Sequence, residues 1–311
     1  MKLKQSIPIR RTPQRGIHRN DPYCTSSHRW VAQVQKNACS VAQLGYHGSF
    51  ERSWRPVPKF NPGVCLHTVQ TEDSKTPETN QAPTPPTANN LKRLAGDLGI
   101  EAIDDPTWAK LAMYCQLAWD WNTKINLTRH TTAELFVQRD LLDSYQLSKL
   151  LQPNEEILDL GTGGGVPGIL LAILRPDLDV SLCDSVAKKA KVAQDIVQKL
   201  GLNTRVFPIS GTLVLAEDRF DSVVARGVGP LVRLCGWLKD EWHKIGRLLA
   251  IKGPRWVDER GEARHRGLLQ GLQLRRMATY PMPGTESQSV ILQIARNTSP
   301  FAKTQIGTIE E

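Results

Sequence analysis

A glycine-rich segment that follows a short apolar run carries the clearest chemical signal in this sequence. Residues 155–184 read EEILDLGTGGGVPGILLAILRPDLDVSLCD, with five glycines and a proline between a strand-like run and a helix-like run. Glycine lets backbone N–H groups approach a ligand closely, and the start of a helix favours negatively charged or polar ligand groups. The segment therefore predicts a loop that binds a cofactor.

Two overlapping glycine patterns fit this loop. Gly163, Gly165 and Gly168 fit the G-x-G-x-x-G pattern of dinucleotide-binding folds. Asp159, Gly161, Gly163 and Gly165 fit a D-x-G-x-G-x-G pattern, which is typical of class I S-adenosylmethionine-dependent methyltransferases. The first pattern predicts NAD(P) as the cofactor, and the second predicts S-adenosylmethionine.

The elements around the loop favour the second pattern. The strand-like run EILDL leads directly into Gly161, so the turn begins there rather than at Gly163. Asp184 ends the next strand-like run, where a carboxylate can accept hydrogen bonds from the ribose hydroxyls of either cofactor. A pair of strands near the C-terminus suits a methyltransferase sheet and is not expected in a dinucleotide-binding domain. We therefore expect S-adenosylmethionine as the cofactor, with an NAD(P)-dependent oxidoreductase as the alternative.

Strand-like and helix-like runs alternate after residue 155, which predicts βαβ units and a parallel sheet covered on both faces. The expected strands are 156–160, 179–184, 204–210, 220–226 and 247–253, with helices over 167–175, 185–201 and 230–244. Residues 272–296 read as two strands joined by a Pro/Gly turn. The whole pattern predicts an α/β, Rossmann-like fold with a mostly parallel seven-stranded sheet that ends in an antiparallel hairpin.

The composition changes sharply near residue 91. Residues 1–90 hold 12 Lys and Arg against 5 Asp and Glu, have no sustained period, and end in a Pro/Thr-rich stretch. Residues 91–152 carry apolar side chains at helical spacing. We predict a disordered basic extension and linker over 1–90, a helical cap over 91–152, a methyltransferase domain over 153–297 and a tail over 298–311. A basic arm that contacts RNA is the alternative for the extension.

The bulk composition narrows the possible compartments. The net charge of +9 is concentrated before residue 91, so it says little about the remaining chain, where the balance is only +2. The six cysteines are widely spaced and contain no Cys-x-x-Cys pair, so neither a disulfide framework nor a metal site is expected. No apolar run approaches the ~20 residues that cross a bilayer. We expect a soluble, cytoplasmic protein without a metal or membrane partner; the sequence carries no signal for its oligomeric state.

The acceptor of the methyl group decides which catalytic groups such an enzyme needs. No Asn/Asp-Pro-Pro-aromatic motif for an exocyclic amine occurs, and Cys183 and Cys235 are not beside proline as a nucleophile for cytosine commonly is. We interpret both cysteines as core residues. Guanine N7 carries a lone pair and no proton, so its methylation requires positioning more than acid–base chemistry. The sequence is compatible with this acceptor, and no catalytic base is assigned.

The chain resembles a known bacterial family. WNTKINLT, LLDS, ILDLGTGGGVPGILLAI, DSVAKK, FDSVVAR and GRLLAIKG occur in the order and spacing of ribosomal RNA small subunit methyltransferase G, also called glucose-inhibited division protein B. The resemblance covers roughly residues 98–296. It implies methylation of N7 of guanine 527, in standard numbering, of 16S rRNA in the small ribosomal subunit, with S-adenosylmethionine as the methyl donor.

The resemblance also implies roles for individual residues. Thr212 and Leu213 match the pair that flanks the adenine, and Arg226 matches an arginine of the cofactor site. Together with the loop, the expected cofactor contacts are Gly161, Gly163, Gly165, Val166, Asp184, Thr212, Leu213 and Arg226. Lys188, Lys189, Lys191 and Lys252 are the expected contacts to RNA phosphates, and a solvated helix face is the alternative for the first three.

The chain departs from the family at three places. The segment SGTLVLAED lacks the usual Arg-Ala/Val-Glu triplet, RDLLDS lacks the histidine before LDS, and GTESQSVILQ lacks the usual basic residues. The alternatives to the family's reaction are a class I methyltransferase with another RNA, protein or small-molecule acceptor, and a non-catalytic RNA-binding module.

Overall fold

The structure is a computed structural model that describes residues 86–303. Nearly all of the predicted extension, up to residue 85, and the end of the predicted tail, from residue 304, lie outside the described residues.

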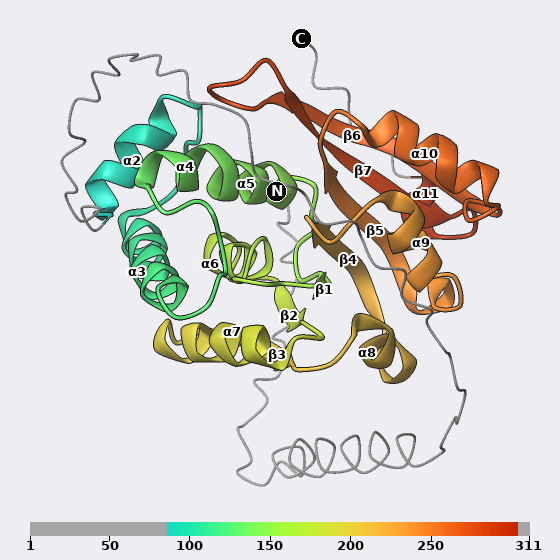
Figure 1. Cartoon of the computed structure of the whole chain (residues 1–311), viewed down its shortest axis with the longest axis horizontal. Coiled ribbons are helices and arrows are strands. Elements are labelled where there is room, and N and C mark those ends of the chain that lie inside the picture. The colour runs from blue at the N-terminus through green and yellow to red at the C-terminus, as the bar shows by residue number, and fades with distance from the viewer. Residues whose placement is uncertain (1–85, 304–311) are drawn as a thin grey trace, which may run out of the picture. The chain divides into compact units, whose positions relative to one another are not determined.

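A seven-stranded sheet forms the centre of the described part of the chain, with the strand order β3-β2-β1-β4-β5-β7-β6 (Figure 1). β1 to β5 are parallel, whereas β7 pairs antiparallel with both β5 and β6. The strands are β1 (Glu156–Leu160), β2 (Asp179–Cys183), β3 (Arg205–Phe207), β4 (Phe220–Arg226), β5 (Ile245–Lys252), β6 (Leu272–Pro281) and β7 (Gln288–Arg296). The predicted fold class and its C-terminal hairpin are confirmed.

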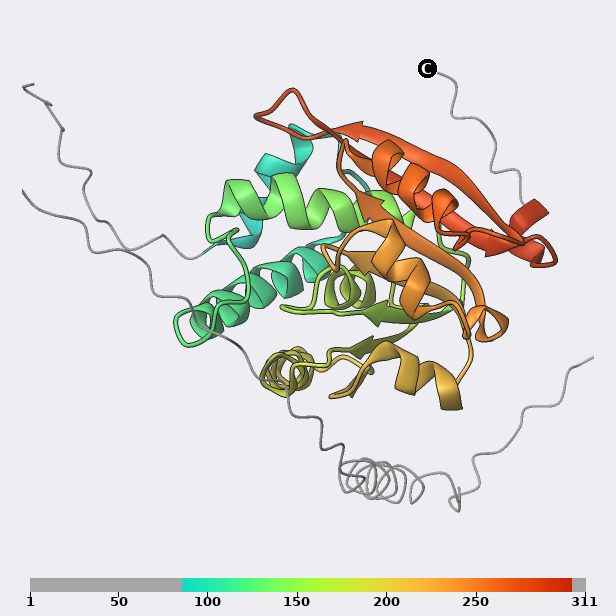
Figure 2. The same ribbon diagram turned by 45° about the vertical axis from the view of Figure 1, so that its right-hand side comes forward.

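Burial explains why these runs form strands. In β1 and β2, every residue after the first is buried, as expected for parallel strands that are covered on both faces. β7 is buried along almost its whole length, whereas most of β6 is only half-buried because it forms the edge of the sheet. The hairpin is the red pair of strands along the outer edge in Figure 2.

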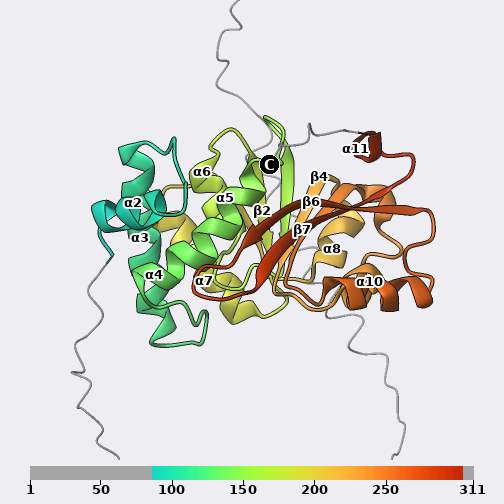
Figure 3. The ribbon, with the colours of Figure 1, turned by 90° about the horizontal axis from the view of Figure 1, so that it is seen from above.

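Helices cover both faces of the sheet (Figure 3). Right-handed crossovers place α6 (Gly168–Leu174) and α7 (Ala187–Lys199) on one face. The other face carries α8 (Gly211–Glu217), α9 (Leu231–Trp237) and α10 (Trp256–His265). α8 and α10 were not among the predicted helices, and α9 ends earlier than predicted, before a short 3₁₀ turn, η3 (Trp242–Lys244).

The helical cap shares one hydrophobic core with the sheet. It contains α2 (Ala88–Gly96), α3 (Asp105–Asn122), α4 (Ala133–Leu135), a π-helical stretch η2 (Phe136–Leu141) and α5 (Leu142–Ser148), so its first helix begins before the predicted start at residue 91. The side chains of Thr87, Asp104 and Thr132 accept hydrogen bonds from the first turns of α2, α3 and α4. α3 packs on α6 and α7, and α5 packs on α6, which places the cap beside the glycine-rich segment.

A buried ion pair lies near the amino ends of the central strands β1 and β5, opposite the glycine-rich segment at their carboxyl ends. Arg247 Nη2 lies 3.0 Å from Glu155 Oε2, and the guanidinium carbon lies 4.4 Å from the ring centre of Phe301. Phe301 belongs to α11 (Pro300–Lys303), so the described start of the predicted tail packs on the sheet.

Candidate cofactor-binding site

The glycine loop, residues 161–168, leaves the carboxyl end of β1. Gly161, Gly163 and Gly165 have φ angles of 71°, 57° and 97°, which other residues adopt only with strain. The backbone N–H groups of Gly161 and Thr162 donate to the carbonyl of Cys183 at 2.9 and 3.0 Å, so the turn is tied to the end of β2. The turn therefore begins at Gly161, as predicted.

Gly163 faces open space. A Cβ atom at this position would meet only the carbonyl oxygen of Gly161, at 4.0 Å. No side chain therefore covers this point of the loop, and its backbone is open to a ligand. Gly165 and Val166 form the later part of the loop; neither lines the pocket described below.

Asp184 joins the loop to the end of β2. One carboxylate oxygen accepts the backbone N–H of Gly163 at 3.0 Å, and the other accepts that of Val186 at 2.8 Å. The side chain is buried at the carboxyl edge of the sheet, where ligands of open α/β folds bind. Each oxygen retains a second lone pair, which fits the predicted contact to ribose hydroxyls.

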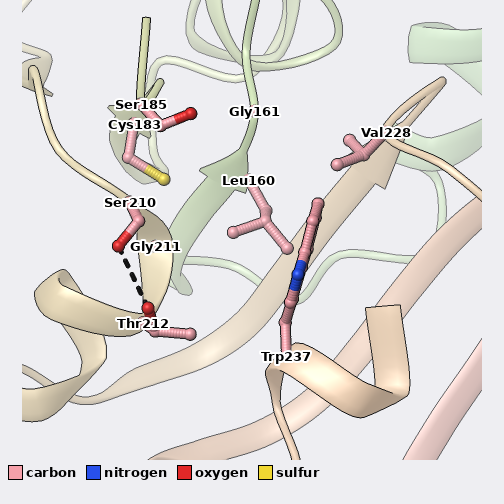
Figure 4. Close-up of a pocket in the computed structure, with 9 residues that line it drawn as sticks. All are labelled: Leu160, Gly161, Cys183, Ser185, Ser210, Gly211, Thr212, Val228 and Trp237. Atoms are coloured by element: carbon pink, nitrogen blue, oxygen red, sulfur yellow. Dashed lines mark hydrogen bonds between the residues drawn. The ribbon is translucent and has the colours of Figure 1, made fainter. Parts of the chain in front are cut away.

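A pocket opens between α8 and α9 at this edge of the sheet (Figure 4). Its cavity volume is about 170 Å³, and the pocket is partly open to solvent. The lining residues are Leu160, Gly161, Cys183, Ser185, Ser210, Gly211, Thr212, Val228 and Trp237. Two of the predicted cofactor contacts, Gly161 and Thr212, are among them, while Leu213 is exposed next to it.

The pocket also contains residues that sequence reasoning missed. Ser210 and Gly211 come directly before Thr212, and Val228 follows β4, so the rule that ligands bind at the carboxyl ends of strands could have found all three. Gly211 allows α8 to approach β1, because a Cβ there would lie 2.1 Å from Leu160 Cδ1. Trp237, at the far end of α9, carries no such signal.

Asp159, at the start of the glycine pattern, is fully enclosed. One of its oxygens accepts the backbone N–H of Gly168 at 2.9 Å, and the other has no partner by hydrogen-bond geometry within the described residues. Burial raises the pKa of Asp159 to about 6, although hydrogen bonds oppose the shift. Asp159 therefore holds the end of the loop through its hydrogen bond to Gly168, and its side chain is shielded from solvent.

The helical cap supports the loop from the other side. The Tyr114 hydroxyl donates to the carbonyl of Gly164 at 2.9 Å, and burial keeps the pKa of this phenol well above its ordinary range. The Asn122 side chain accepts the backbone N–H groups of Leu127 and Thr128 at 2.8 and 2.9 Å. This closes the WNTKINLT segment into a compact turn whose Leu127 packs against Gly164.

Arg226 does not line the pocket. Its guanidinium forms ion pairs with Asp140 and with Asp143, the latter at 3.1 Å, and donates to the carbonyl of Arg139 at 3.2 Å. Burial alone would lower the pKa of Arg226, but the two carboxylates raise it, so the group stays charged. In this placement Arg226 ties β4 to the helical cap, and its contact to the cofactor stays a prediction.

Two more side chains complete this Arg226 cluster. His130 Nδ1 lies 2.7 Å from Asp140 Oδ1, and the Tyr280 hydroxyl of β6 donates to Asp143 at 2.7 Å. Asp140 stands in the π-helical stretch, within the RDLLDS segment. The cluster therefore joins the cap, β4 and the hairpin through charged and hydrogen-bonded groups.

The four predicted RNA contacts fall into two sets. Lys188 and Lys191 are exposed and Lys189 is half-buried on α7, which follows Asp184. Lys252, in contrast, has its Nζ 2.6 Å from Glu259 and donates to the carbonyl of Gly229 at 2.7 Å. Lys252 is therefore placed to hold the loop between β4 and α9, because β5 ends directly beside that loop, rather than to reach RNA from an exposed surface.

The cysteines offer no nucleophile in the described part of the chain. Cys115, Cys183 and Cys235 are buried and free, as the core interpretation of the last two predicted. Burial raises the pKa of Cys183 to about 12 and that of Cys235 to about 11, so both thiols stay protonated.

Among residues 86–303, no group of three or more His, Cys, Asp or Glu side chains could hold a metal ion, and no helix is long and apolar enough to cross a membrane.

The fold and site together define a class of enzyme. The sheet order, the glycine turn after β1, the acidic residue after β2 and the pocket beside β4 are those of a class I S-adenosylmethionine-dependent methyltransferase. The open space at Gly163 and the free lone pairs of Asp184 fit that cofactor.

Comparison with known proteins gives the family. The sequence model of rRNA small subunit methyltransferase G matches residues 107–285, and the chain belongs to this family. It is 53% identical over 192 residues to ribosomal RNA small subunit methyltransferase G of Rhodopirellula baltica, covering 62% of this chain and 83% of that protein. The same enzyme of Clostridium novyi is 36% identical over 165 residues, or 50% of this chain and 67% of that protein. The predicted family and cofactor are confirmed.

Among solved structures, TrmK of M. capricolum with S-adenosyl-homocysteine has a TM-score of 0.40 and 19% identity, over 50% of this chain and 68% of that chain.

Proposed function

We propose that this chain transfers the methyl group of S-adenosylmethionine to N7 of guanine 527 in 16S rRNA. Membership of the rRNA small subunit methyltransferase G family is the observation that carries the proposal. The lone pair of N7 would form the new N–C bond while the methyl–sulfur bond breaks, leaving a positively charged 7-methylguanine and neutral S-adenosylhomocysteine. No proton moves in this step, so the reaction needs no general base.

The residues of the site support such a reaction by holding the two reactants. The glycine loop would hold the amino-acid end of the cofactor, Asp184 the ribose hydroxyls, and Ser210 and Thr212 the adenine edge. The buried, protonated thiol of Cys183 is suited to lining the pocket rather than to attacking a base. Catalysis would then come from orientation of guanine N7 against the methyl group.

We further propose that the small ribosomal subunit is the partner and the cytoplasm the compartment. Lys188 and Lys191 are exposed on α7, directly after the proposed ribose contact. Their ammonium groups would reach RNA phosphates and orient the substrate without reading its sequence.

A methyl-transfer assay tests the proposal. The full chain is incubated with labelled S-adenosylmethionine and either small subunits or naked 16S rRNA, both lacking the modification, and the RNA is digested to nucleosides. Label in 7-methylguanosine supports the proposal, and the better substrate identifies the preferred form. Label in another nucleoside would keep the cofactor but reject the acceptor. Absence of label from both RNAs would place the acceptor outside 16S rRNA.

A further inference from the structure

Trp237 is the largest side chain in the pocket, and the core does not use it. α9 buries Leu231, Leu234 and Cys235 against the sheet, whereas Trp237 at the end of the same helix is 46% exposed. Its indole N–H has no hydrogen-bond partner among the described residues. An aromatic ring of this size is usually buried when only packing determines its position, so its place at a pocket wall suggests a ligand.

The pocket has the shape and polarity of a site for a flat heteroaromatic ring. Leu160 forms an apolar floor, and Val228 and Trp237 form an apolar wall (Figure 4). The hydroxyls of Ser210 and Thr212, 3.0 Å apart, lie across the hollow. The indole is seen edge-on in Figure 4, with one face turned towards these hydroxyls. A purine in this space could place one face against the indole and the other towards the hydroxyls.

Exposed apolar side chains gather around the same pocket. Of the five large exposed hydrophobic residues in the described part of the chain, Val186 and Leu213 directly follow the pocket-lining residues Ser185 and Thr212, and Trp237 lines the pocket itself. Exposed apolar groups that cluster at a concave site are typical of ligand binding.

We infer that Trp237 stacks against the adenine ring of S-adenosylmethionine and sets much of the affinity for the cofactor. This inference rests on the proposed placement of the cofactor, with its amino-acid end at the glycine loop and its ribose at Asp184. The cofactor's adenine then continues past Ser185 into the space between α8 and α9. The target guanine must instead approach the methyl group at the glycine loop, so the pocket wall at Trp237 faces the cofactor and not the RNA.

Calorimetric titration with S-adenosylhomocysteine tests the inference on the full chain. Trp237→Ala is expected to weaken binding by about 5- to 140-fold, the usual range for removing an aromatic ring that stacks on a base. Trp237→Phe, which keeps a ring, is expected to retain most of the affinity. Trp256→Ala is the matched control, because Trp256 stands on α10 near Arg260 and not in the pocket. The melting temperature of each variant reports whether it is folded.

Further readouts separate the possible roles of the ring. 5′-Methylthioadenosine contains the adenine and ribose but no amino acid, and Trp237→Ala is expected to weaken its binding by the same factor. In the methyl-transfer assay, the KM for S-adenosylmethionine is expected to rise by a similar factor.

Unchanged affinity of Trp237→Ala for S-adenosylhomocysteine, while the wild type binds it and methylates RNA, would overturn the inference and leave the proposed function standing. Unchanged affinity with a raised KM for RNA would also overturn it, by assigning the ring to the RNA. A wild type that does not bind S-adenosylhomocysteine would reject both the inference and the proposed function.

Discussion

At the scale of single residues, the loop depends on backbone positions that only glycine fills without cost. Gly161 and Asp184 were predicted from the sequence because both follow strands whose ends are easy to locate. The hydrogen bond from Gly163 to Asp184 could not be predicted, because it depends on how closely β1 and β2 approach. That bond makes the acidic residue part of the loop as well as the proposed ribose contact.

Gly163→Val is expected to weaken binding of S-adenosylhomocysteine at least a hundredfold, because the side chain would occupy the open space beside the loop. The positive φ angle of 57° should also lower the free energy of unfolding by about 1–2 kcal/mol. Gly201→Val is a matched control, since Gly201 has a similar φ of 63° and open surroundings but follows α7 and does not belong to the glycine loop. Calorimetry and urea unfolding measure both effects; equal affinities of the two variants would contradict the loop assignment.

The buried carboxyl of Asp159 predicts a dependence of stability on pH. Its folded-state pKa of about 6 lies above the ordinary value of 3.8, so the folded protein holds this proton more tightly than the unfolded chain does. The group's contribution therefore favours folding most below pH 4, decreases as the pH rises to about 6, and is lost above that. The total change is on the order of 2–3 kcal/mol.

Asp159→Asn should remove the part of the pH dependence of stability that comes from this carboxyl, because an amide does not titrate. The amide oxygen can still accept the N–H of Gly168. The measurement is urea unfolding of both proteins from pH 4 to pH 8. Parallel stability curves for the two proteins would show that the carboxyl titrates normally.

At the scale of elements, two charged residues predicted to bind ligands also form ion pairs that join separate elements. Arg226 and Lys252 end neighbouring strands, and the position of Arg226 at a strand end supported its predicted cofactor contact. Their partners, Asp140, Asp143 and Glu259, come from the cap and from α10. Spacing in one sequence cannot reveal such pairs, because they depend on how separate elements pack.

Arg226→Met is expected to lower the free energy of unfolding by about 3 kcal/mol, because it leaves Asp140 and Asp143 buried without their cation. Combining it with Asp140→Asn should restore part of the loss, which a double-mutant cycle in urea measures. Strongly reduced cofactor affinity with unchanged stability would instead support the role that the family resemblance implies for Arg226.

Lys188→Ala and Lys252→Met should differ in their effect on RNA binding. Removing an exposed phosphate contact at Lys188 is expected to reduce the slope of log affinity against log salt by about 1. Lys252→Met should leave that slope unchanged, since its ammonium is paired with Glu259, while making the protein less stable. Filter binding of the small subunit at several salt concentrations measures the slope for each variant. A reduced slope for Lys252→Met would support Lys252 as an RNA contact.

At the scale of the whole molecule, the alternation of strands and helices was enough to predict the sheet. The strand runs are apolar and bounded by polar or glycine residues, so their order and the final hairpin could be located. α8 was missed because GTLVLAE is short and follows β3 closely, and α10 because WVDERGEARH has a weak apolar face with only Ala263 buried. The pocket between α8 and α9 could therefore not be foreseen in full.

Deletion of residues 1–85 is expected to leave kcat/KM for methyl transfer nearly unchanged, because the described helices, core and pocket all lie after that point. Deletion of residues 1–90 should lower the melting temperature, because it removes Thr87, which caps α2, and exposes the otherwise buried Leu91. Comparing both truncations with the full chain checks this. A large loss of activity in the first truncation would make the basic extension an RNA-binding arm.

The central claim is that this family member methylates one guanine at N7, and mapping the modified position tests it most directly. 7-Methylguanine makes the RNA chain cleavable by borohydride and aniline, and primer extension on the treated 16S rRNA then shows where cleavage occurred. The account predicts a single strong stop at guanine 527 after incubation with the full chain and S-adenosylmethionine, and none with Gly163→Val. A stop at another guanine, or no stop although methyl groups enter the RNA, would contradict it.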